Sequence, residues 1–178
     1  MTTSSMLLAL LLSAFLGRHE GGKPIFFSIG RECHFSSPDL KDHFELMATG
    51  EDTLTSRIHF SILSSRGDTL YSYELGPSDI LGALNHQPTP TERRERIARL
   101  FGELQQFLSD DKFLIPALPP GAEYENDNVN FDRSDWEDIA SDQTAVGFRI
   151  VRCVDLSYYV AYSKAKDKVV RYLIICCP

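Results

Sequence analysis

The fold is decided by AVGFRIVRCVDLSYYVAYSKAKDKVVRYLIICC, residues 145–177, which contains three runs rich in β-branched and aromatic side chains. This composition is typical of strands, and the connections between the runs are too short for a crossover helix. We therefore expect strands at 145–153, 157–163 and 169–177, joined as an antiparallel meander. The last run is apolar apart from Arg171, which predicts a strand in the interior of the sheet.

Working outward, the first half of the chain predicts a hairpin. RIHFSIL (57–63) and TLYSYEL (69–75) both alternate between apolar and other side chains, and the residues between them include Gly67. A further strand is expected at 23–29. Ser37-Pro38 predicts the start of a short helix through about Met47, because serine caps helices well and proline suits the first turn.

The longest helix is predicted to start at Thr89, which has capping-box spacing to Glu92. Its apolar residues form a single stripe, as in an amphipathic helix: Ile97, Leu100, Phe101, Leu104 and Leu108. Two arginines of this helix lie four residues from glutamates, in the pairs Glu92–Arg96 and Glu95–Arg99. We expect such pairs to leave a solvated helix face rather than a phosphate site. Short helices are also expected at 77–84 and from Ser134, where Ser-x-x-Glu repeats the capping box.

These elements predict one α+β domain over residues 1–178, with an N-terminal hairpin, one long amphipathic helix and the C-terminal meander. A chain of 178 residues is long enough to bury a core without metal or disulfide support. Residues 1–22 contain an apolar stretch, MLLALLLSAFL (6–16), too short to span a bilayer. We interpret it as a buried N-terminal helix, and the alternative is a cleaved secretory signal peptide.

The four cysteines show no C-x-x-C spacing of a zinc or redox site. They are Cys33, Cys153, Cys176 and Cys177. Free thiols suit a reducing compartment, so a cytoplasmic location is expected. The alternative is a secreted domain in which cysteines pair.

The charge of the chain is concentrated in the segment 110–142. This segment carries ten carboxylates against Lys112 and Arg133, a net charge of −8, whereas the whole chain carries −7. A concentrated field is typical of a surface that recognises a partner of opposite charge. The low pI of about 5.2 argues against nucleic-acid binding, which depends on lysine and arginine.

The acidic segment also contains aromatic side chains, which are common at interface hot spots. Together these features predict a docking surface for a basic protein, formed by Tyr124, Asp127, Phe131, Asp132, Asp135, Trp136 and Glu137. A small acidic inhibitor or immunity-type protein that blocks a toxin or nuclease is the most concrete version, by analogy of size and charge alone. We expect this binding to weaken with salt and on Asp135→Lys.

Part of the acidic segment resembles a calcium-binding EF-hand loop. The oxygen-bearing residues at the loop positions would be Asn126, Asn128, Asn130, Asp132, Ser134 and Glu137. Phe131 replaces the glycine of the sharp turn, and Asn126 replaces the usual first aspartate. We therefore expect no metal and no cofactor.

The enzymatic alternative is a site assembled from Cys33, His34 and His59. A thiol beside an imidazole is the arrangement that nucleophilic catalysis uses. The sequence contains no phosphate loop, nucleophile elbow or metalloprotease motif. We therefore predict a non-catalytic protein. Convergence of these three side chains in one pocket would instead favour the enzymatic alternative.

Overall fold

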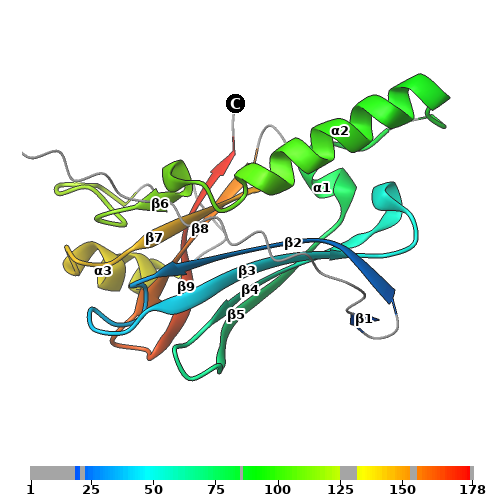
Figure 1. Ribbon diagram of the computed structural model, residues 1–178. Coiled ribbons are helices and arrows are strands. Elements are labelled where there is room, and N and C mark those ends of the chain that lie inside the picture. The colour runs from blue at the N-terminus through cyan, green and yellow to red at the C-terminus, as the bar shows by residue number, and fades with distance from the viewer. Residues whose placement is uncertain (1–18, 21–22, 85, 125–131, 153–155, 177–178) are drawn as a thin grey trace, which may run out of the picture.

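The computed structural model describes residues 19–20, 23–84, 86–124, 132–152 and 156–176 (Figure 1). The fold is α+β, as the sequence predicts, with two antiparallel sheets and helices. The predicted N-terminal apolar helix at 6–16 lies outside the described residues. Within the described part of the chain, no helix is both long and apolar enough to cross a membrane.

The first sheet has five strands in chain order. They are β1 (His19–Glu20), β2 (Lys23–Cys33), β3 (Asp42–Thr49), β4 (Arg57–Leu63) and β5 (Thr69–Leu75). The predicted hairpin is confirmed as β4 and β5. Its turn is closed by the Ser64 amide, which donates to the Asp68 carbonyl at 2.7 Å, and Gly67 takes a positive φ of 88° there.

The second sheet contains the predicted meander. Its strands are β6 (Phe113–Leu114), β7 (Gly147–Arg152), β8 (Leu156–Ser163) and β9 (Lys168–Cys176), in that order across the sheet. The prediction that the last strand lies in the sheet's interior is wrong, because β9 is at the edge. Its apolar character has another cause: α3 (Arg133–Ser141) covers one face of β8 and β9, and the core lies against the other.

The strand β3 replaces the helix predicted for residues 37–47. Its residues alternate strictly, with Phe44, Leu46 and Ala48 buried on one face. The residues before it form a turn that is held by Asp42, whose carboxylate accepts from the Ser36 amide at 2.6 Å and from the Ser36 hydroxyl at 3.0 Å. Asp42 is 1% exposed, so this buried carboxylate fixes the entry into the strand.

The remaining helical elements lie in the connections between strands. η1 (Thr53–Thr55) lies between β3 and β4 of the first sheet, whereas α1 (Pro77–Leu81), α2 (Pro90–Gln106) and η2 (Asp110–Lys112) connect the first sheet to the second. The Thr89 capping box of α2 is confirmed, because the Thr89 hydroxyl accepts from the Glu92 amide and Glu92 accepts from the Thr89 amide. The predicted Glu92–Arg96 pair is absent from the described residues. The ion pair that forms instead joins Arg93 to Asp52 of the neighbouring loop at 2.8 Å.

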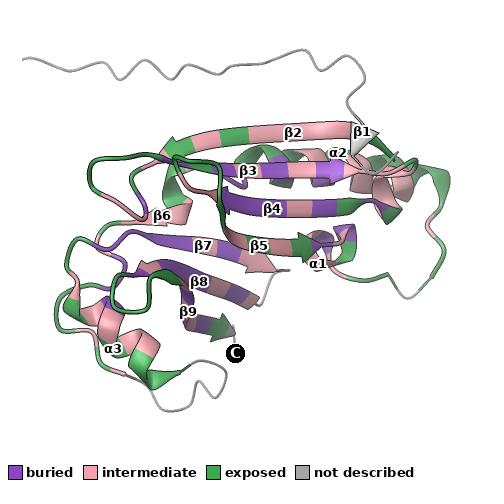
Figure 2. Ribbon diagram, turned by 90° about the horizontal axis from the view of Figure 1, so that it is seen from below, coloured by how far each residue is buried: buried purple, intermediate pink, exposed green. Residues whose placement is uncertain are grey.

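Both sheets and α2 share one hydrophobic core. In Figure 1, α2 lies over one face of the first sheet, and the strands of the second sheet cross the first at a steep angle. Phe148 of β7 joins the two sheets, with ring centroids 5.2 Å from Phe44 and 5.1 Å from Phe60. Leu100 and Leu104 of α2 complete this cluster without solvent exposure. The buried residues run along β3, β4, β7 and β8 in Figure 2.

A second, smaller cluster lies on the opposite face of the second sheet, under α3. Ile139 of α3 and Tyr172 of β9 are buried there with Ala117. The Tyr172 hydroxyl donates to the Ala117 carbonyl at 2.9 Å, and Gly147 of β7 leaves the space that this hydroxyl occupies. α3 is therefore held in a fixed position on a rigid sheet, with its other face toward solvent.

Candidate functional site

The acidic segment begins α3 with an aspartate cap. Asp132 is the N-cap, and its carboxylate accepts from the Ser134 amide at 2.9 Å. The predicted capping role of Ser134 is wrong, since its hydroxyl instead accepts from Lys166 at 2.8 Å. The Ser134 amide hydrogen bond is the main reason that the pKa of Asp132 lies below its ordinary value.

Asp132→Ala should lower the melting temperature of the protein by about 2–4 °C, because the first amides of α3 lose their acceptor. Ser134→Ala is the matched control and should change the melting temperature by less than about 1 °C, because Ser134 does not cap the helix. Thermal unfolding followed by circular dichroism measures both. A larger loss for Ser134→Ala than for Asp132→Ala would contradict the assignment of the cap.

Lysines from the turn between β8 and β9 meet the acidic segment. The Lys166 ammonium lies 2.5 Å from the Asp135 carboxylate and 3.7 Å from that of Asp132. The neighbouring Lys164 pairs with Asp142 at 2.6 Å. Asp135 is 17% exposed at its side chain, whereas Asp132 keeps 63%. The turn therefore neutralises part of the negative charge of α3 and fixes the carboxylates in place.

The aromatic side chains of this surface lie against each other. The rings of Tyr124 and Trp136 make an edge-to-face contact at 5.6 Å, and both are half-buried. The Arg133 guanidinium lies 5.4 Å from the Tyr124 ring centroid and pairs with Glu137 at 2.8 Å. Glu137 is 55% exposed at its side chain, so this carboxylate is directed toward solvent.

The structure thus brings together five of the seven residues predicted for docking. Tyr124, Trp136, Asp132, Asp135 and Glu137 lie on or beside α3. The other two, Asp127 and Phe131, lie outside the described residues. We name the group of Tyr124, residues 132–142, Lys164 and Lys166 the α3 surface. It carries more carboxylates than cations, although the two lysines reduce the excess.

The described residues of the EF-hand-like pattern make other interactions. Asp132 caps α3, and Glu137 pairs with Arg133. Among the described residues, no group of three or more His, Cys, Asp or Glu side chains is placed to hold a metal ion.

The histidine and cysteine side chains of the enzymatic alternative do not converge. Cys33 pairs across the sheet with Asp42, and His59 pairs with Met47, five residues further along β3. At about 3.3 Å per residue, this separation is roughly 16 Å along the strand. The two side chains also lie on opposite faces, because Asp42 is on the buried face of β3 and Met47 on the other. His34 is exposed beyond the end of β2.

The Cys33 thiol is poorly suited to act as a nucleophile. It is a free, half-buried thiol, and burial raises its pKa above the ordinary value, while Arg31 offsets only part of the rise. A raised pKa disfavours the reactive thiolate. Cys153, Cys177 and the side chain of Cys176 lie outside the described part of the chain.

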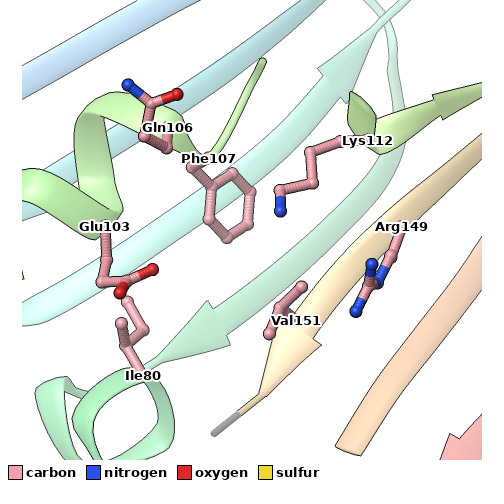
Figure 3. Close-up of a pocket in the computed structure, with 7 residues that line it drawn as sticks. All are labelled: Ile80, Glu103, Gln106, Phe107, Lys112, Arg149 and Val151. Atoms are coloured by element: carbon pink, nitrogen blue, oxygen red, sulfur yellow. The ribbon is translucent and has the colours of Figure 1, made fainter. Parts of the chain in front are cut away.

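A small cavity lies between the end of α2 and the edge of β7 (Figure 3). Its volume is about 60 Å³, and its lining residues are Ile80, Glu103, Gln106, Phe107, Lys112, Arg149 and Val151. Ligand pockets usually measure about 300–1,000 Å³, and one water molecule takes about 30 Å³. This cavity therefore admits a few water molecules but not a metabolite.

A cluster of arginines and tyrosines forms where β5 approaches β9. Tyr73 of β5 meets Tyr158 of β8 with ring centroids 6.2 Å apart. The guanidinium carbons of Arg152 and Arg171 lie 5.9 and 4.2 Å from the Tyr158 ring centroid. Arg152 pairs with Asp79 of α1. The sequence does not predict this cluster, because its only signal along the chain is Arg171, the single arginine in the apolar run of β9.

Comparison with known proteins gives no family for this chain. No family model, no curated protein and no solved structure matches it.

Proposed function

We propose that this protein is a non-catalytic protein-binding module whose α3 surface docks a basic protein. An acidic inhibitor of the immunity type, which blocks a basic toxin or nuclease, is the most concrete form of the proposal. The main support is one observation: the solvent-exposed carboxylates of Asp132 and Glu137 flank the half-buried, contacting rings of Tyr124 and Trp136. Aromatic anchors within complementary charge are typical of interface hot spots.

The ion pairs within the α3 surface favour binding by preorganisation. Lys166 holds Asp135 and Asp132, and Arg133 holds Glu137, so these side chains have less rotamer freedom to lose when a partner docks. The same pairs make Asp135 a poor site for a test, because Asp135→Lys would remove the main ion pair of Lys166 and place two ammonium groups side by side. Glu137 is the better choice, since its one ion pair is exposed and is worth little to folding.

The experiment is a comparative pull-down with three baits at about 0.1 M and 1 M NaCl, whose Debye lengths are about 10 and 3 Å. The baits are the wild type, Glu137→Lys and Glu95→Lys. Glu95 is an exposed carboxylate on α2, so its reversal makes the same change of charge away from the α3 surface.

We expect the wild type and Glu95→Lys to retain a basic protein at low salt. Glu137→Lys should fail to retain it, and high salt should release it from the other two baits. A partner retained equally by all three baits at high salt would contradict docking through the α3 surface.

A further inference from the structure

The two arginines of the cluster at the β5–β9 seam differ in how their charges are compensated. Arg152 donates to the Asp79 carboxylate and to the Tyr158 hydroxyl at 3.5 Å. Hydrogen bonds from the Gly76 amide and from Arg152 hold the pKa of Asp79 below its ordinary value, although burial acts in the opposite direction. The charge of Arg152 is therefore matched by a fixed carboxylate.

Arg171 has no such partner. Among the described residues, no carboxylate forms an ion pair with Arg171, and its Nε is buried without a hydrogen-bond partner. Its guanidinium carbon lies 4.2 Å from the Tyr158 ring centroid, and the guanidinium also hydrogen-bonds the Tyr71 hydroxyl. Both partners are neutral, so neither balances its charge. Arg171 as a whole is half-buried, and a guanidinium whose charge no carboxylate balances is stabilised by an anion.

The tyrosines beside Arg171 supply neutral donors. Burial raises the pKa of Tyr71, and the Arg171 guanidinium offsets only part of this rise. Burial also raises the pKa of Tyr73, whose ring stacks on that of Tyr71 at 6.4 Å. Both phenols therefore keep their protons at neutral pH and donate hydrogen bonds. Both are only half-buried, and Arg152 is 32% exposed at its side chain, so solvent reaches the seam.

We propose that the seam between β5 and β9 binds a phosphate group, free or esterified to a small molecule, on Arg171 with Tyr71 and Tyr73. Phosphate fits better than carboxylate because it carries more acceptor oxygens, which can be shared between the guanidinium fork and two hydroxyls. Arg152, whose charge Asp79 already neutralises, lies beside this site and leaves the unbalanced charge to Arg171. This inference is independent of the docking proposal, because the seam uses none of the residues of the α3 surface.

The test is a titration of the ¹⁵N-labelled full chain with sodium phosphate, with ionic strength kept constant by sodium chloride. We expect saturable shifts at the amides of Tyr71, Tyr73 and Arg171. Arg171→Met should weaken binding by about tenfold or more, because hydrogen bonds to charged groups carry large free energies. Arg57→Met is the matched control, since Arg57 is exposed on β4 and should leave binding unchanged.

Two further variants keep the test decisive if Arg171→Met fails to fold. Arg171→Lys retains the charge but loses the fork, and Tyr71→Phe loses one donor, so each should weaken phosphate binding severalfold. Phenyl phosphate that binds more tightly than phosphate indicates an aromatic ester as ligand, and equal binding indicates the free anion. The assignment would be overturned if phosphate caused no shifts at the seam, or if the shifts persisted unchanged in the variants. It would also be overturned if acetate at equal concentration caused the same shifts.

Discussion

Phe148→Ala should lower the free energy of unfolding by about 3–5 kcal/mol, the largest effect of any substitution considered for this protein. Phe148 is fully buried, and its ring contacts those of Phe44, Phe60, Phe107 and Phe113. Because these rings come from the first sheet, from the end of α2 and from β6, truncation leaves a cavity where all three meet. Urea denaturation with an unchanged m-value measures the loss.

Leu40→Ala is the control for this prediction. Leu40 is 51% exposed, so its truncation should change the free energy of unfolding by no more than about 0.5 kcal/mol. A loss below about 1 kcal/mol for Phe148→Ala would show that the two sheets do not depend on a common core.

Gly147→Ala should destabilise the protein by about 1–3 kcal/mol, although it adds only one methyl group. The new Cβ would collide with the Tyr172 hydroxyl and approach Ala117 to 3.2 Å. The hydroxyl would have to move, and the Ala117 carbonyl would lose the hydrogen bond that it now accepts at 2.9 Å. Urea denaturation again provides the measurement.

Gly102→Ala is a control with the opposite expected sign. Gly102 lies in α2 with open space at its Cβ position, so alanine should stabilise the helix by about 0.5–1 kcal/mol. Tyr172→Phe removes the hydroxyl that the new methyl would strike. The double variant with Gly147→Ala should therefore lose less than the sum of the two single losses, and strict additivity would contradict the proposed collision.

The correctly predicted elements are those with local signals. The hairpin of β4 and β5 follows from alternation on both sides of Gly67, and α2 follows from its capping box and its apolar stripe. The meander follows from short connections, which leave no room for a crossover. In each case, neighbouring residues alone determine the structure.

Other elements depend on contacts that the sequence does not display. Ser37-Pro38 has the chemistry of a helix start, but Asp42 binds the preceding amides, and the alternation of β3 continues from there. β9 is apolar at a sheet edge because α3, which precedes β7 and β8 in the chain, covers one of its faces. Tertiary contacts therefore decide both cases against the local pattern.

The α3 surface and the arginine–tyrosine cluster also differ in how far the sequence predicts them. The carboxylates and rings of the α3 surface lie in one segment of the chain, so the sequence shows them together. Its lysines, Lys164 and Lys166, come from a distant turn. The arginine–tyrosine cluster draws Tyr71, Arg152, Tyr158 and Arg171 from four strands. No spacing along the chain links these residues, so only the folded arrangement shows that the charge of Arg171 lacks a carboxylate partner in the described structure.

The docking proposal is tested most directly by dissociation constants for the basic partner that the wild-type bait recovers. Its binding to the wild type, to Glu137→Lys and to Glu95→Lys is measured at about 0.1 M and 1 M NaCl. If the α3 surface docks the partner, Glu137→Lys should weaken binding by about tenfold or more at low salt, and Glu95→Lys should not change it. The difference should shrink at high salt. Equal dissociation constants for the wild type and Glu137→Lys at low salt would contradict the docking proposal.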